Sequence, residues 1–196
     1  MSKCNPDPQG QIKRLTKILE QNRTLYHVIE QAVGIGLKDY YIGAGCIAQT
    51  VWNHQSGFAL THGISDIDFA YYDSSDRSFA AEHATLERIT RIIEPDEIRL
   101  DIKNQARVHL WYKDHFGYEI APYDSLERAI NTWPTTATSV GVRLENGKLN
   151  VYAPFGLDDL FGMIVRANKA QITEEIYLQK SKKWREKWPE LTVIPW

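Results

Sequence analysis

Residues 64–72 alternate strictly between two kinds of side chain, a pattern that a half-buried β-strand satisfies. Asp66 and Asp68 lie two residues apart, so both carboxylates of such a strand point to the same side. The other side carries Ile67, Phe69 and Tyr71, which need a hydrophobic core to pack against. The segment therefore predicts a strand with acidic residues on one face and the core on the other.

The paired aspartates also carry a chemical implication. Two neighbouring carboxylates repel each other, and a divalent cation between them removes the repulsion. Mg²⁺ prefers such hard oxygen ligands and leaves positions free for the phosphates of a substrate. An isolated Asp-x-Asp sequence is common and often marks only a solvated edge or turn. Here Asp66 and Asp68 lie in an otherwise apolar and aromatic run, which favours a metal site.

A glycine turn precedes the acidic strand. Residues 39–42 form a short β-rich run, Gly43-Ala44-Gly45 follow it, and residues 46–52 have a helical pattern. Such a turn leaves backbone N–H groups free at the positive end of a helix, where a phosphate can bind. Glycines at this kind of junction often serve turn geometry alone. Together with the acidic pair, however, the turn supplies the two parts that nucleotidyl or phosphoryl transfer requires.

The remaining pattern predicts further helices and strands around this segment. A long amphipathic helix covers residues 11–33 with a possible break near Asn22, and a strand–helix–strand unit is completed by a helix over 76–93 and a strand over 98–102. A short helix is favoured over a strand for 108–116, and another is predicted for 125–133. Residues 139–144 and 149–152 indicate a hairpin, and two helices follow from Gly156.

Length, charge and cysteine content limit the classes of protein to which the chain can belong. With 196 residues we expect a loose tail over 1–10 and one domain over 11–196, in which about 156–196 form a helical part. The formal net charge of -2 disfavours strong sequence-independent binding to a nucleic-acid duplex. The two cysteines are too few for a disulfide framework, and no apolar run approaches the roughly 20 residues of a membrane span. We therefore expect a cytoplasmic protein.

The glycine turn before a helix and the Asp66-Ile67-Asp68-Phe69 strand resemble the signature of the DNA polymerase beta-like nucleotidyltransferase superfamily. A bacterial branch of nucleotidyltransferase-like proteins is similar over most of the chain. The similar segments are residues 43–53, 66–73, 103–109, 133–143 and 153–161. The resemblance implies an α/β (α+β) fold, with a small mixed sheet flanked by helices and additional C-terminal helices. It also implies metal-dependent transfer of a nucleoside monophosphate from an NTP.

The resemblance implies roles for particular residues. Asp66 and Asp68 would bind Mg²⁺, or Mn²⁺ in its place, and the third carboxylate of the family maps onto Asp101, which could equally be a strand acid in an ion pair. Gly43, Ala44 and Gly45 would hold the nucleotide phosphates. Two departures stand out: Ala44 occupies a position where Gly or Ser is usual, and the spacing from Gly43 to Asp66 is long, which an inserted loop over 54–62 would explain.

A polar cluster follows the predicted strand over 98–102. Its members, which offer donors for triphosphate oxygens or a base edge, are Lys103, Asn104, Gln105 and Arg107. We predict that Lys103, Asn104 and Arg107 bind the nucleotide; the alternative is a solvated turn. The acceptor stays open between a small molecule, RNA and protein. Two other readings also stay open: a nucleotide- or partner-binding descendant without turnover, and a toxin-like enzyme that modifies RNA or protein, to which the basic run over 180–188 gives a hint.

Overall fold

A five-stranded sheet in the order β3-β2-β1-β4-β5 forms the centre of the computed structural model, which describes residues 7–93 and 98–196. Its strands are β1 (Tyr40–Gly43), β2 (Asp66–Tyr71), β3 (Arg99–Asn104), β4 (Gly141–Glu145) and β5 (Lys148–Tyr152). Within this five-stranded sheet β2 and β3 pair in parallel, and the other neighbours are antiparallel. The predicted mixed sheet and the hairpin of β4 and β5 are therefore confirmed.

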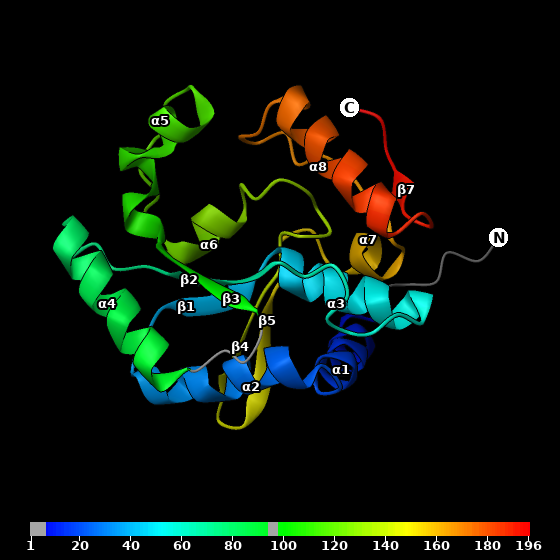
Figure 1. Ribbon diagram of the computed structural model, residues 1–196, viewed down its shortest axis with the longest axis horizontal. Helices are drawn as coiled ribbons and strands as arrows, with labels where there is room; N and C mark the ends of the chain where they lie inside the picture. Colours follow the sequence, from blue (N-terminus) through cyan, green and yellow to red (C-terminus); the bar gives the residue numbers. More distant parts are fainter. Residues whose placement is uncertain (1–6, 94–97) are drawn as a thin grey trace.

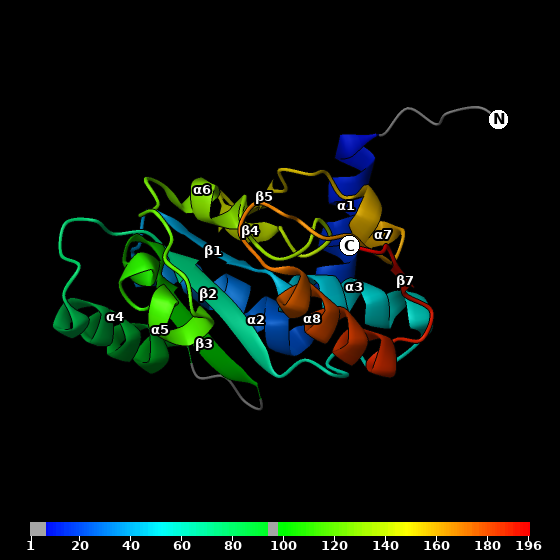
Figure 2. The same ribbon diagram turned by 90° about the horizontal axis from the view of Figure 1, so that it is seen from above.

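Helices flank the sheet on both sides. They are α1 (Pro8–Leu19), α2 (Arg23–Ala32), α3 (Gly45–Ser56), α4 (Phe79–Ile92), α5 (Tyr112–Phe116), α6 (Leu126–Ile130), α7 (Asp158–Phe161) and α8 (Glu174–Lys187), with 3-10 turns η1 (Val33–Ile35) and η2 (Gln105–Leu110). Figure 1 shows α2 and α4 on one side of the sheet and α5, α6 and α8 on the other, and Figure 2 shows the same arrangement from above. The α/β fold class is confirmed.

Asn22 separates the first two helices, which confirms the predicted break. Its side-chain carbonyl accepts a hydrogen bond from the backbone N–H of Leu25 at 3.2 Å and thereby caps α2. Its amide donates to Thr50 Oγ1 at 2.8 Å and to the carbonyl of Leu60 at 3.1 Å. The first helix begins at Pro8, three residues before the predicted start. Residues 1–6 of the predicted tail lie outside the described residues.

The two faces of β2 have different partners. Ile67, Phe69 and Tyr71 are buried in the main core, as the alternation predicts. On the other face Ala70 packs with Tyr41 of β1 and with residues of α6 in a small second core. This second core covers only one end of the face, so the end that carries the aspartates stays open.

The C-terminal part lies against α3. Trp52 of α3 contacts the rings of Trp184 and Trp188, each at 5.6 Å between centroids. Trp188 Nε1 also donates to Asn53 Oδ1 at 2.7 Å, a contact that buries both side chains. The tryptophans thus dock α8 beside the start of the acidic strand.

Two short strands in this part were not predicted. β6 (Ile164–Val165) and β7 (Thr192–Val193) form a separate parallel pair. Two residues are too few for any periodicity to indicate a strand. In the part of the chain that the structure describes, no helix combines the length and the apolar character that a membrane crossing requires.

Candidate active site

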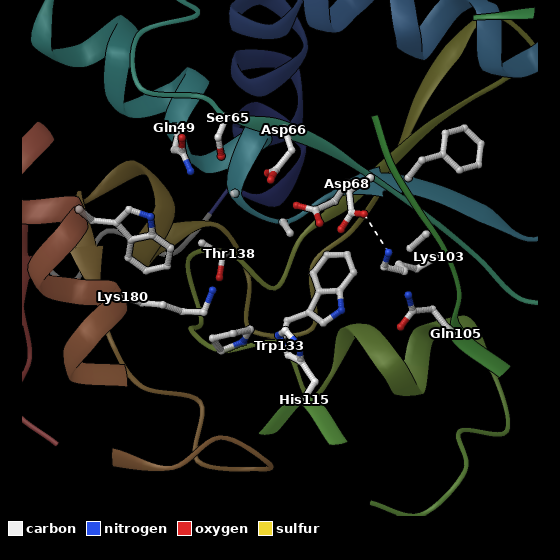
Figure 3. Close-up of a pocket in the computed structure, with 17 residues that line it drawn as sticks. Gln49, Ser65, Asp66, Asp68, Lys103, Gln105, His115, Trp133, Thr138 and Lys180 are labelled. Atoms are coloured by element: carbon white, nitrogen blue, oxygen red, sulfur yellow. Dashed lines mark ion pairs between the residues drawn. The ribbon is translucent and has the colours of Figure 1, made fainter. Parts of the chain in front are cut away.

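A cavity of about 540 Å³ opens above the uncovered end of the sheet, and we call it the acidic cavity. Its lining comes from the turn before α3, from β2 and β3, from the segment after α6 and from α8. The lining residues are Ala44, Gly45, Gln49, Ser65, Asp66, Asp68, Phe69, Ala70, Asp101, Lys103, Gln105, His115, Trp133, Pro134, Thr138, Lys180 and Trp184. Figure 3 shows the carboxylates on one side of this cavity and Lys180 on the other.

Strand pairing brings the three predicted carboxylates together. Asp68 of β2 is the register partner of Asp101 of β3, and Asp66 lies one pleat away on the same face. The carboxylates on either side of Asp68 each form an ion pair with a side chain of β3. Lys103 Nζ lies 3.0 Å from Asp101 Oδ1, and an Arg99 nitrogen lies 3.4 Å from Asp66 Oδ2. Asp68, between them, has no such ion pair among the described residues.

The central carboxylate is electrostatically unfavourable as an anion. Burial, followed by the carboxylates of Asp66 and Asp101, raises the pKa of Asp68 from 3.8 to about 7. The charge of Lys180 and the backbone N–H of Gly45 act in the opposite direction. Near neutral pH, Asp68 is therefore poised between its neutral and its charged form.

The glycine turn joins β1 to α3 beside these carboxylates. Ala44 has φ 58° and ψ −129°, a conformation that glycine adopts freely and that costs energy in a residue with a Cβ. Ala44 and Gly45 line the acidic cavity, whereas Gly43 does not. Gly43 instead allows a close approach of neighbours, since a Cβ there would lie 2.4 Å from the carbonyl of Val140 and 2.9 Å from the ring of Trp133.

Gln49, Lys180 and Trp184 are among the cavity residues that the reasoning from sequence missed. Gln49 lies one helical turn after Gly45, and its Oε1 is buried without a hydrogen-bond partner among the described residues. Lys180 and Trp184, one turn apart on α8, close the opposite wall. The basic, tryptophan-containing run was noticed in the sequence, but no pattern indicated that Lys180 faces the aspartates.

The predicted polar cluster after β3 divides into two parts. Lys103 lines the acidic cavity. Asn104 is buried and bonds the backbone of Asp73, and Arg107 is buried in an ion pair with Glu82. The structure does not bring Asn104 and Arg107 into the cavity, because both hold the loop between β2 and α4 in place. Their predicted nucleotide-binding role is not supported by this placement.

The donor set suits a divalent metal ion. Three carboxylates on one face offer the oxygen ligands that Mg²⁺ prefers. Burial and then the repulsion by Asp66 and Asp101 raise the pKa of Asp68, and a cation would relieve both effects. Within residues 7–93 and 98–196, no three His, Cys, Asp or Glu side chains converge as a ready metal centre. Binding would therefore require the carboxylates to turn away from Arg99 and Lys103.

Comparison with known proteins identifies the family of the chain. Residues 30–193 match the model of the family described as Nucleotidyltransferase. A solved structure described as "The NMR structure of the protein reveals a CCA-adding enzyme head domain" is similar with a TM-score of 0.74 and 26% identity, over 92% of this chain and 96% of that chain. None of the curated proteins matches. The chain belongs to the nucleotidyltransferase family, whose members take an NTP as substrate and transfer a nucleotidyl group to an acceptor.

Proposed function

We propose that the protein is a metal-dependent nucleotidyltransferase of the DNA polymerase beta-like kind, which moves a nucleoside monophosphate from an NTP to a hydroxyl group of an acceptor. The observation that carries this proposal is the meeting of Asp66, Asp68 and Asp101 with the turn before α3 in one cavity. The carboxylates supply a metal anchor, and the positive end of the α3 dipole at Gly45 favours a bound phosphate. The acceptor class and the cytoplasmic location stay predictions.

The three aspartates would hold Mg²⁺ or Mn²⁺, which would neutralise the charge of the triphosphate. The positive end of the α3 dipole attracts the terminal phosphates, and Lys180 offsets their charge from the opposite wall. Asp101 orients the acceptor hydroxyl and takes its proton. The acceptor oxygen bonds to the α-phosphorus, the bond from that phosphorus to the bridging oxygen breaks, and pyrophosphate leaves.

Transfer of label from each α-labelled NTP tests the proposal. Wild type, Asp68→Asn and the control Asp114→Asn are incubated with Mg²⁺ or Mn²⁺ and with separate pools of RNA, protein and small molecules. Asp114 is exposed on α5 and lies outside the acidic cavity, so its substitution leaves the site intact. We expect label in one pool with wild type and Asp114→Asn, and none with Asp68→Asn.

The same assay separates the rival functions. Label in the RNA or protein pool would favour a macromolecule-modifying enzyme, for which the exposed Lys182, Lys183 and Arg185 of α8 offer a docking surface. Metal-dependent NTP binding without transfer to any pool would favour a binding protein. Full transfer by Asp68→Asn would contradict the mechanism.

A further inference from the structure

A second cavity of about 230 Å³ adjoins the acidic cavity, and we call it the side cavity. The two share Asp68, Asp101, Lys103, Gln105, Trp133, Pro134 and Lys180. Beyond the shared residues, the walls of the side cavity are mostly apolar or aromatic, including Val108, Trp111, Phe116 and Ile176. Complete drug-sized ligands occupy about 300–1,000 Å³, so this space suits one ring system of a larger ligand.

Gln105 is a buried polar residue without a structural partner. It is the first residue of η2, only 8% of its surface is exposed, and its side chain lines both cavities. No hydrogen bond joins its amide to another of the described residues, and Figure 3 shows the amide beside Lys103 at the cavity. The amide is not among the fully buried, unpartnered side-chain atoms of the described residues, so it opens into the cavities that the residue lines. The amide is therefore available to a ligand.

The far wall of the side cavity is held in place by tyrosines. Tyr118 donates to the carbonyl of Gln171 at 2.8 Å, and Tyr123 donates to Gln171 Oε1 at 2.8 Å. Tyr112 and Tyr118 join their hydroxyls at 3.2 Å. Gln171 lines the side cavity, and these hydrogen bonds fix its position. This polar edge is fixed before any ligand arrives.

Trp133 stands where the two cavities meet. Its ring packs against Gly43, where the missing Cβ leaves room for it, and Figure 3 shows the indole between the carboxylates and His115. Tryptophan in this position offers a flat face on which another ring can stack. Its placement beside Asp68 and Asp101 puts that face within the same site as the phosphates of a bound nucleotide.

We propose that the side cavity binds the nucleobase of the NTP, with Trp133 as the stacking surface and Gln105 as the residue that reads the edge of the base. A nucleobase is the flat end of an NTP and carries hydrogen-bonding edges that a glutamine amide matches. The apolar walls disfavour phosphate, which has better partners at the start of α3 and at Lys180. The inference rests on the proposed function, because it assumes that the triphosphate lies at the aspartates.

Calorimetric titration with Mg²⁺ tests the assignment, using each of the four NTPs and tripolyphosphate, which has no base. The variants are Gln105→Leu, which keeps the size of the side chain, and the control Gln179→Leu on the exposed face of α8. We expect wild type and the control to bind at least one NTP about tenfold or more tighter than tripolyphosphate. Gln105→Leu should lose about tenfold for that NTP and nothing for tripolyphosphate.

Trp133→Phe provides a second measurement that does not depend on Gln105. Stacking of a base on the indole changes its fluorescence, so an NTP should change the emission of wild type more than that of Trp133→Phe, and tripolyphosphate should change neither. Equal affinity of NTPs and tripolyphosphate would overturn the inference and leave the proposed function standing. Unchanged NTP binding by Gln105→Leu, or an equal loss for both ligands, would also overturn it. No binding of either ligand to wild type would overturn the inference and the proposed function together.

Discussion

Asp68→Asn should stabilise the metal-free protein while it abolishes metal-dependent nucleotide binding. Burial and the carboxylates of Asp66 and Asp101 raise the pKa of Asp68 to about 7, so its ionised form is disfavoured in the folded state. Asparagine has a similar shape, keeps an oxygen that can accept from the N–H of Gly45, and carries no charge. The substitution thus removes a charge repulsion that lowers the stability of the metal-free folded protein.

The magnitude follows from the pKa. A carboxyl that titrates at about 7 in the folded chain and near 3.8 in the unfolded chain costs up to roughly 4 kcal/mol above pH 7. Solvent reaches the partly exposed Asp68, and the nearby lysines can move, so we expect about 1–3 kcal/mol. For a chain of this length this corresponds to a rise in Tm of about 2–12 °C at pH 8.

The difference in stability between Asp68→Asn and wild type should depend on pH in a defined direction. Between the unfolded and folded pKa values the folded state binds a proton at Asp68 that the unfolded state does not, so wild type regains stability as pH falls. The difference in Tm between Asp68→Asn and wild type should therefore be largest at pH 8 and close towards pH 4. Thermal melting in a chelator at several pH values measures it, with Asp114→Asn as control. A lower Tm of Asp68→Asn at pH 8, or a difference independent of pH, would refute the reasoning.

Three further substitutions test other parts of the site. Ala44→Gly relieves the positive φ and should raise the free energy of unfolding by about 0.5–1 kcal/mol in denaturant titration; a decrease would show that the turn is not strained. Lys180→Ala should weaken binding of tripolyphosphate with Mg²⁺ about tenfold, whereas Lys182→Ala, outside the acidic cavity, should leave it nearly unchanged; equal effects would contradict the placement of Lys180. Asn53→Ala removes three hydrogen bonds, including the one from Trp188, and should cost about 2–4 kcal/mol of stability; an unchanged denaturation midpoint would contradict the docking role.

The acidic half of the site follows from local sequence, because a strand alternates with period two. Alternation alone puts Asp66 and Asp68 on one face, and the structure confirms the strand and its buried side. The position of Asp101 could not be predicted from its own segment, since it depends on the parallel register that pairs Asp101 with Asp68. The register between two strands that are 33 residues apart cannot be predicted from the sequence of either strand alone. The family resemblance was the indication that pointed to Asp101.

The residues that sequence reasoning misplaced depend on distant partners. Asn104 and Arg107 follow a strand, where ligand-binding residues often lie, yet Asp73 and Glu82 bind them from the preceding loop and helix. Lys180 is the converse case, because it was not predicted to be in the site but lines the cavity. It is one of several lysines on α8, and it reaches the cavity because tryptophans hold that helix against α3. A periodic pattern identifies a helix face but does not show which element that face will meet.

α3 connects the two walls of the acidic cavity. Its first residue, Gly45, belongs to the glycine turn that we propose binds phosphate, and Trp52, about two helical turns further on, is the residue on which α8 docks. Lys180 is therefore positioned relative to the turn through a rigid helix and a buried aromatic cluster, rather than through a loop. Electrostatic stabilisation of a developing charge requires groups that are fixed in advance, because groups that must reorient lose much of their effect. The tryptophans supply that fixation for a lysine whose own side chain is exposed.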